Sequence, residues 1–394
     1  MASLALICPN LGMSSDLIAK FEDQCMIIIG DRGPAFESIH QFLQDMPEVQ
    51  NTSLSEYDPL GWSDLMVDRL DEISTPLLAF LNAISLPSMP PPKQTNGEIA
   101  GITYQIRGSG PPLILFPLFL APSQWGPLIP KLSERYTTIT LGGTEVGPVA
   151  LLEARGHARG YREMIGAMIE QTSLKSGDTM LEVGYGSGAV MRAMVARTQK
   201  QNVITGVDIN AYLLAEGRAL AQKERLEDLI KTQEGSAISL PFPDNSFDIT
   251  YSVTVIEEVD ANTMIAEMIR VTKPKGQIGV IARAVDLPYV VNLPLEPHLK
   301  MKVEQPGGGV SENGCADASL YRRFHGAGLT HLITFPHFTP FGSSDPFVLA
   351  FLEPGFLQGL TAEECEAWKA AKIKAKDTFF IAWPHHCAVG TKTE

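Results

Sequence analysis

The stretch Gly177-Asp-Thr-Met-Leu-Glu-Val-Gly-Tyr-Gly-Ser-Gly188 decides the fold of this chain. Its apolar residues Met180–Val183 predict a short buried strand, and the glycines that follow turn the chain into an amphipathic helix over 190–197. A backbone that turns this sharply, or that a ligand approaches closely, cannot carry a Cβ atom. A second apolar run, 203–207, ends at Asp208, about 20 residues beyond the glycines. Strand, glycine turn, helix, strand and acid in this order predict a βαβ nucleotide-binding site.

The spacing of the glycines favours one cofactor. The loop reads Glu182-x-Gly184-x-Gly186-x-Gly188, with an acid just before the first glycine. A dinucleotide site needs Gly-x-Gly-x-x-Gly, with a helix N-terminus facing a pyrophosphate. An acid at the mouth of the loop suits a ligand that carries cationic groups. S-adenosyl-L-methionine has a sulfonium and an ammonium group and no phosphate, so the loop favours this cofactor.

From these residues onward, the segment 161–286 resembles the class I S-adenosylmethionine-dependent methyltransferases, of the small-molecule type related to ubiquinone- and menaquinone-biosynthesis enzymes. Leu240-Pro-Phe-Pro-Asp-Asn-Ser-Phe-Asp-Ile249 is similar to the family's entry into the fourth strand. Ile269-Arg-Val-Thr-Lys-Pro-Lys-Gly276 is similar to its motif before the fifth. The resemblance implies an α/β fold: a Rossmann-like sheet of seven mostly parallel strands, covered by helices on both faces and ending in an antiparallel hairpin.

The resemblance also implies which residues bind the cofactor. Many relatives carry Gly-Asp-Ala where this chain has Gly235-Ser236-Ala237, so the hydrogen bond to adenine would lack a charge. Tyr161 could reach the carboxylate end of the methionine. The implied set is Glu182, Gly184, Gly186 and Gly188 at the methionine end, Asp208 at the ribose, and Ile209, Ser236 and Ala237 beside the adenine.

The acceptor is expected at the C-terminal end of the fourth strand, residues 252–258, because open α/β sheets bind ligands at the carboxyl ends of their strands. Glu257 or His386 could take a proton from the acceptor there. Glu257 could instead be a helix N-terminal acid that the helix dipole favours. His386 could be an ordinary strand residue near the site. The family mechanism is in-line displacement, in which positioning does most of the catalytic work.

Residues 1–86 have neither a glycine-rich site nor an alternating strand pattern. Helices are predicted at 14–23, at 33–46 and from Leu65 to Leu81, the last one kinked near Pro76. The region is therefore predicted to be a small helical domain or arm. Its apolar stripes could pack on the rest of the chain or build a homodimer.

A Pro-rich linker, residues 87–97, follows. The short α/β segment 98–150 reads strand, strand, helix, strand and resembles the opening of an α/β-hydrolase. Because no Gly-x-Ser-x-Gly nucleophile elbow follows, we interpret this segment as a structural remnant or mimic. Residues 151–394 are predicted to form the methyltransferase domain. Within it, the Pro- and Gly-rich insertion around 287–316 is predicted to be a lid over the acceptor pocket.

Composition excludes several function classes. A net charge of −14 argues against nucleic acid or an anionic membrane surface as the main partner. No apolar run reaches the roughly 18–20 residues of a membrane span. The five cysteines are scattered, which indicates a reduced, cytoplasmic protein without a cysteine metal site. No histidines stand at helical metal-binding spacing, so no metal is expected.

The sequence thus predicts methyl transfer from S-adenosyl-L-methionine to a small-molecule acceptor, and the added N-terminal segments suggest a specialised metabolite. Two alternatives remain open. The fold could be reused for a cyclisation or rearrangement without methyl transfer, with the cofactor as a bound charge. The chain could also be a non-catalytic interaction partner that binds another protein through its N-terminal region.

Overall fold

In the computed structural model the chain forms two compact units, Met1–Ala150 and Leu151–Glu394. Helix α6 (Gly147–His157) spans the division in the sequence. Among the described residues, no helix is both long and apolar enough to cross a bilayer. The structure describes residues 3–9, 21, 24–33, 36–58, 64–84, 87, 88, 90, 92–118, 120–305 and 309–394.

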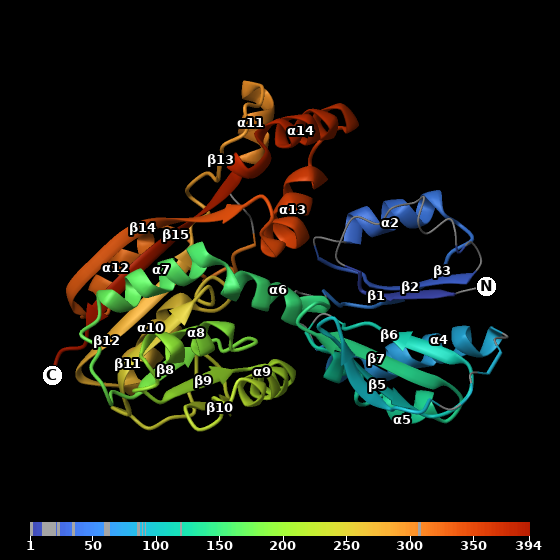
Figure 1. Ribbon diagram of the computed structural model, residues 1–394, viewed down its shortest axis with the longest axis horizontal. Helices are drawn as coiled ribbons and strands as arrows, with labels where there is room; N and C mark the ends of the chain where they lie inside the picture. Colours follow the sequence, from blue (N-terminus) through green and yellow to red (C-terminus); the bar gives the residue numbers. More distant parts are fainter. Residues whose placement is uncertain are drawn as a thin grey trace. The chain divides into compact units, whose positions relative to one another are not determined.

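An eight-stranded, mostly parallel sheet organises the second unit (Figure 1). The strand order is β10-β9-β8-β11-β12-β15-β13, and β14 also pairs with β15. The α/β class, the mostly parallel sheet and the closing antiparallel hairpin are confirmed; the eighth strand is the two-residue β13. The parallel strands are β8 (Met180–Val183), β9 (Ile204–Asp208), β10 (Ile230–Glu234), β11 (Phe247–Val253) and β12 (Thr272–Arg283); the antiparallel ones are β13 (Val290–Val291), β14 (Thr330–Gly342) and β15 (Phe380–Thr391).

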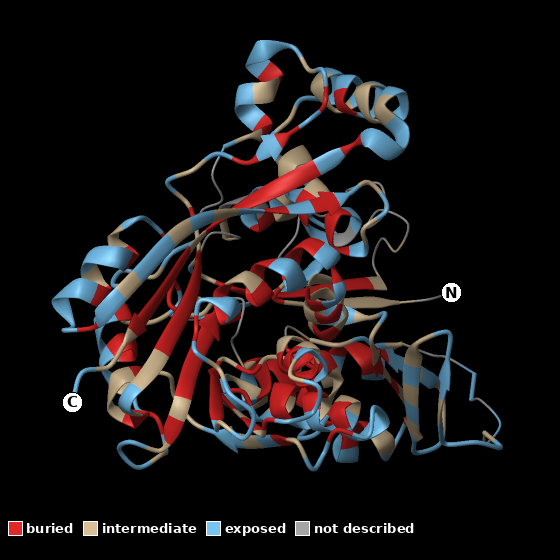
Figure 2. Ribbon diagram, turned by 60° about the vertical axis from the view of Figure 1, so that its left-hand side comes forward, coloured by how far each residue is buried: buried red, intermediate tan, exposed pale blue. Residues whose placement is uncertain are grey.

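Helices cover both faces of this sheet, and therefore its central strands are buried (Figure 2). Strand β8 reads Met-Leu-Glu-Val without alternation because both of its faces meet a core. One core lies under α7, α8 and α9, and the other under α10 and α12. The bounds are α7 (Arg159–Glu170), α8 (Ala189–Arg197), α9 (Ala211–Lys223), α10 (Ala261–Val271) and α12 (Ser319–Gly326).

Two insertions extend the carboxyl edge of the parallel strands. The first, between β12 and α12, contains β13 and α11 (Pro297–Val303) and covers the predicted lid region; its movement stays a prediction. The second lies between β14 and β15. Because β15 is antiparallel to β12, its first residues stand beside the last residues of β12. The second insertion contains η3 (Val348–Leu352), α13 (Glu353–Gln358), α14 (Ala362–Ala375), which begins with a capping box formed by Thr361 and Glu364, and η4 (Lys376–Thr378).

Residues 1–86 contain a parallel sheet, so the prediction of a purely helical region is wrong. The central strand β2 reads Cys-Met-Ile-Ile-Ile-Gly and is buried throughout. A strand that is covered on both faces shows no alternation, so a search for alternation misses it. The predicted helix at 14–23 lies outside the described residues, except Phe21. The sheet comprises β1 (Leu4–Ile7), β2 (Cys25–Gly30) and β3 (Gln50–Leu54), and the helices are α2 (Phe36–Asp45), α3 (Leu65–Asp68) and α4 (Leu70–Ala83).

A second, four-stranded sheet completes the first unit, in the order β4-β5-β7-β6. Its first strand begins at Asn96, within the predicted linker. Trp125 and Leu132 join Leu65 and Phe80 in one apolar cluster, so both sheets of this unit share a core. Its likeness to a hydrolase stays a prediction. The elements are β4 (Asn96–Ile99), β5 (Ile102–Arg107), β6 (Pro112–Leu115), η2 (Pro122–Trp125), α5 (Ile129–Ser133) and β7 (Thr137–Gly143).

Candidate active site

The glycine loop follows β8 and is tied to the neighbouring strand. The backbone N–H groups of Gly184 and Tyr185 both donate to the Val207 carbonyl, at 2.8 and 3.0 Å. Gly184, Gly186 and Gly188 have φ of 89°, 55° and 77°, a region that other residues enter only with strain. The loop therefore needs its three glycines for conformation alone, and it delivers the chain directly into α8.

We expect Gly184→Ala to weaken binding of S-adenosylmethionine at least about tenfold, which is about 1.4 kcal/mol. An added Cβ atom would lie 2.1 Å from Val255 Cγ2, so the glycine loop or the loop after β11 must move. Gly177→Ala is the matched control: Gly177 has φ of 87°, but its added Cβ meets nothing within 4 Å. Titration calorimetry on both variants separates the steric effect from backbone strain. Equal losses of affinity in Gly184→Ala and Gly177→Ala would mean that the cofactor does not bind at the glycine loop.

Asp208 ends β9 and turns its carboxylate towards the glycine loop. Its Oδ2 accepts from Gly186 N at 2.8 Å, and its Oδ1 accepts from Asn210 N at 2.9 Å. Burial raises the pKa of Asp208, and these backbone N–H groups oppose the rise. Each carboxylate oxygen keeps a second lone pair, so the group can still accept from a diol.

The residues predicted to lie beside the adenine are grouped around Asp208. Ile209 follows it directly and is 72% exposed, which leaves an apolar side chain free to cover a flat base. Gly235 N donates to the Asp208 carbonyl at 3.0 Å, so Ser236 and Ala237 leave the sheet at the same edge. The structure thus brings Asp208, Ile209 and the 235–237 segment together, and their contacts with a cofactor stay predictions.

Glu182 is fully buried in β8 and receives a hydrogen bond from Tyr251 Oη at 3.3 Å. Burial raises the pKa of this carboxyl well above its usual range, and the charge of Asp208 raises it further, whereas Tyr251 and Arg192 oppose the rise. Burial therefore makes the charged form of Glu182 less favourable than it is in water. A cationic ligand at the loop would stabilise the charged form instead.

A buried arginine is hydrogen-bonded to the glycine loop. Its role was not predicted from the sequence. Arg192 of α8 is 4% exposed. Its Nη1 donates to the Ser187 carbonyl at 2.8 Å and its Nε to Glu224 Oε1 at 2.8 Å, while Nη2 bonds to the buried Glu153 of α6. The signal was a charged residue on the apolar face of a short helix. We infer that Arg192 fixes the loop rather than contacting the cofactor.

At the carboxyl end of β11, Glu257 lies fully buried against Arg283 of β12. The Arg283 backbone N and Nε both donate to Glu257 Oε1, at 3.1 and 3.0 Å, and its Nη2 donates to Glu258 Oε1 at 2.8 Å. Burial raises the pKa of Glu257, and Arg283 opposes the rise. Thr254, just before this pair, has φ of 54°, which is strained for a β-branched residue and is frequent at functional sites.

His385, rather than the predicted His386, turns into the interior next to Tyr161. The ring centroids of His385 and Tyr161 are 6.3 Å apart in an edge-to-face arrangement, and both side chains are fully buried. Successive residues of a strand face opposite sides. His386 therefore lies on the other face, with its Nε2 2.7 Å from Asp286 Oδ1. The structure does not bring His386 together with Tyr161, and a catalytic role for it is an untested prediction.

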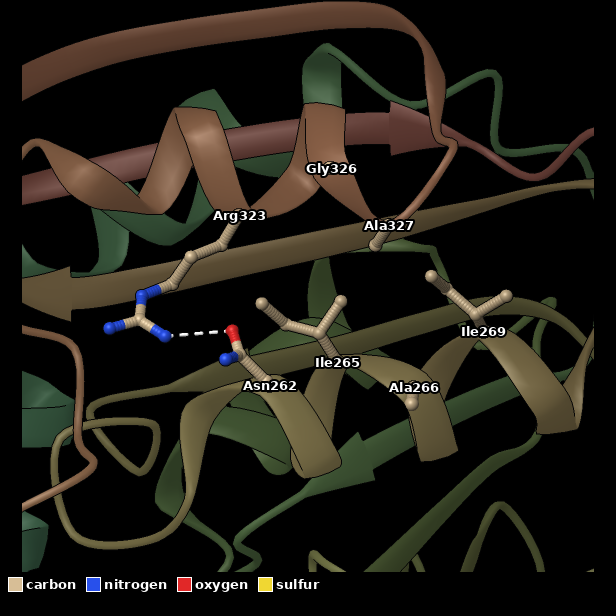
Figure 3. Close-up of a pocket in the computed structure, with 7 residues that line it drawn as sticks. All are labelled: Asn262, Ile265, Ala266, Ile269, Arg323, Gly326 and Ala327. Atoms are coloured by element: carbon tan, nitrogen blue, oxygen red, sulfur yellow. Dashed lines mark hydrogen bonds between the residues drawn. The ribbon is translucent and has the colours of Figure 1, made fainter.

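A groove between α10 and α12 lies apart from these residues (Figure 3). Ile265, Ile269 and Ala327 line it, and Arg323 Nη1 donates to Asn262 Oδ1 at 2.7 Å across it. None of the predicted site residues lines this groove. Within the described part of the chain, no three His, Cys, Asp or Glu side chains are grouped so that they could hold a metal ion.

Comparison with known proteins finds a family profile that matches the segment around the glycine loop. The profile described as "Methyltransferase domain" matches residues 181–280. The chain is 36% identical to a sterol 24-C-methyltransferase of Gibberella zeae over 108 residues, which are 27% of this chain and 28% of that protein. It is 29% identical to a demethylmenaquinone methyltransferase of Symbiobacterium thermophilum over 151 residues, 38% of this chain and 55% of that protein.

The chain thus spans between about a quarter and just over half of the length of these curated relatives. Among solved structures, the YcgJ protein of Bacillus subtilis aligns with 59% of this chain and 99% of its own, at 18% identity and a TM-score of 0.41. The profile match covers β8 to β12, with the glycine loop and Asp208 between them. Residues 181–280 of the second unit therefore resemble the methyltransferase domain of these relatives, which are named as methyltransferases of sterols and of demethylmenaquinone.

Proposed function

We propose that the protein transfers a methyl group from S-adenosyl-L-methionine to a small-molecule acceptor. The observation that carries the proposal is the contact between the glycine loop and Asp208, at 2.8 Å, inside the segment that the methyltransferase profile matches. The contact holds a positive-φ glycine next to a carboxylate with free lone pairs. This is the donor and acceptor arrangement that a ribose beside a close backbone turn requires.

Three groups of residues would bind the three parts of the cofactor: the ribose, the adenine and the methionine end. Asp208 would accept from the ribose hydroxyls, and Ile209, Ser236 and Ala237 would border the adenine. The glycine loop, with Glu182 beneath it, would hold the methionine end. When bound, the cofactor supplies an electrophilic methyl group on a positively charged sulfur. The chain positions the acceptor in line with that methyl group and excludes water, and buried Glu257 or a neighbouring base accepts a proton if the acceptor releases one.

The acceptor would bind at the carboxyl edge of β11 and β12, beneath the two insertions. Relatives named for sterols and demethylmenaquinone suggest an apolar acceptor, and a specialised metabolite remains our proposal. Homodimer formation through residues 1–86 and a cytoplasmic location are further predictions. Analytical ultracentrifugation of the full chain tests the dimer.

Asp208→Ala should weaken S-adenosylmethionine binding by about 1–3 kcal/mol, since the ribose loses its charged acceptor and the loop loses an anchor. Titration calorimetry on wild type and variant measures this. Asp228→Ala is the control, because Asp228 is exposed and precedes β10 at the opposite edge of the sheet. Equal affinities for wild type and Asp208→Ala would refute this assignment. Release of S-adenosylhomocysteine on turnover separates methyl transfer from a cyclisation or rearrangement, in which the cofactor is not consumed.

A further inference from the structure

Near the carboxyl ends of β11 and β12 and the first half of β15, three polar atoms are buried without a hydrogen-bond partner among the described residues. They are Tyr161 Oη, His385 Nε2 and Glu257 Oε2. Leaving a buried donor or acceptor unpaired costs about 1–3 kcal/mol each, so native proteins keep few of them. Three in one place indicate groups that await a ligand.

Contacts within and around the group show that these three side chains are neighbours. The Tyr161 and His385 rings meet at 6.3 Å. His385 stands opposite Arg283 in the β12–β15 ladder, and Arg283 binds Glu257. Glu257 and Arg283 act electrostatically on Tyr161 and His385 respectively. The strained Thr254 adjoins the group, and its hydroxyl opposes the rise that burial causes in the pKa of Tyr161.

The contacts of His385 determine which ring nitrogen carries the proton. Its Nδ1 lies 3.0 Å from the Trp383 carbonyl and 3.2 Å from Thr339 Oγ1. A carbonyl only accepts, so Nδ1 must carry the hydrogen and donate it. Burial lowers the pKa of His385 to about 3, so the ring stays neutral. Nε2 therefore presents a bare lone pair. The Tyr161 hydroxyl adjoins the Thr254 hydroxyl but makes no well-aligned hydrogen bond to a described residue.

A ligand group that satisfies both atoms must donate one hydrogen bond and accept another. A hydroxyl group does this, whereas an ether or a ketone cannot donate and an ammonium group cannot accept. The surroundings are aromatic on the His385 side: Trp383 lies 4.9 Å from the His385 ring, and Phe347 stacks on Trp383 at 5.6 Å. On the Tyr161 side, the Arg155 guanidinium lies 5.1 Å from the ring centroid. Planar apolar groups pack well against such rings.

We propose that Tyr161 and His385 form a binding site for a hydroxyl group carried on a planar, apolar molecule. Calling that molecule the methyl acceptor rests on the proposed function; the hydroxyl site itself does not. The hydroxyl donates to His385 Nε2 and accepts from Tyr161 Oη. Glu257 Oε2 is a further buried polar atom without a hydrogen-bond partner near these two groups.

Phenol and anisole test this site, because they differ only in the hydroxyl hydrogen that anisole replaces by methyl. The full chain is titrated with each probe at millimolar concentration, with and without saturating S-adenosylhomocysteine, by ligand-observed NMR. We expect wild type to bind phenol at least tenfold more tightly than anisole. His385→Leu should lose the preference, and Tyr161→Phe should reduce it. His385→Gln should keep it, since the Gln side-chain oxygen can replace Nε2.

A single cooperative unfolding transition and an unchanged far-UV circular dichroism spectrum show that each variant is folded. Equal binding of the two probes to wild type, a phenol preference that survives in His385→Leu, or no binding of phenol would overturn the proposal. Failure of the proposed function looks different: wild type would not bind S-adenosylhomocysteine, while the phenol preference in its absence would still report on the hydroxyl site.

Discussion

Replacing Arg192 by alanine is expected to lower the free energy of unfolding by about 3–5 kcal/mol. The substitution leaves Glu153, which is 3% exposed, as a buried carboxylate without its cation. It also removes the donor from the Ser187 carbonyl in the glycine loop. An uncompensated buried charge is among the largest penalties that one substitution can cause. Urea unfolding of the full chain measures the effect.

Arg197→Ala provides the comparison on the same helix. Arg197 is paired with Glu170 at the surface, where both side chains are about half exposed. Pairs of this kind contribute at most about 1 kcal/mol. Arg192→Ala should also weaken cofactor binding, since the loop loses its brace, and Arg197→Ala should not. Similar losses of stability in the two variants would contradict the role assigned to Arg192.

Arg283→Met should destabilise the protein by about 3 kcal/mol near pH 7.5 and by much less near pH 5. Burial already raises the pKa of Glu257, and Arg283 opposes that rise. Without the guanidinium, the pKa of Glu257 in the folded state rises further. A folded-state pKa above the unfolded value means that the folded state holds a proton that the unfolded chain releases. Stability is then present at low pH and falls as pH increases through the folded pKa.

Denaturant unfolding of wild type and variant between pH 5 and pH 8 tests this, with the difference between the two widening as pH rises. Glu258 also loses its ion pair with Arg283, so its pKa shifts in the same direction and adds to the pH dependence, whereas Tyr161 is not paired with Arg283. Arg283→Met combined with Glu257→Gln should recover most of the loss. Lys273→Met, at the other end of β12 in a half-exposed pair with Asp248, is the control. A loss that does not depend on pH would mean that Glu257 is not the group responsible.

The second unit was predictable because its signals are local. Glycines at fixed spacing, an apolar strand before them and Asp208 after the next strand all act within one βαβ unit, and the structure has these elements where the sequence predicts them. The same kind of prediction failed for strand β2. Its Cys-Met-Ile-Ile-Ile-Gly run has no alternation, and only the surrounding helices and strands decide between strand and buried helix.

The parts of the site that depend on distant pairing could not be predicted. Whether His385 or His386 faces the interior is set by the register of β15 against β12, which one residue of slip would reverse. Arg192 stands in a helix whose partner Glu153 is 39 residues away, so no local pattern reveals the pair. The motif at Glu257 was visible, but its partner Arg283 becomes apparent only when β11 and β12 are adjacent.

Gly342 and Phe380 are Cα partners on the last rung of the β14–β15 ladder, and the whole second insertion stands between them. The ladder therefore closes without the insertion, and a two-residue Asn-Gly turn has the geometry to join the strands directly. The insertion can therefore be treated as an exchangeable segment, because the two residues that flank it, Gly342 and Phe380, are already paired. Chimaeras could exchange it between homologous chains and thereby alter the acceptor side, while the cofactor half keeps its own sequence.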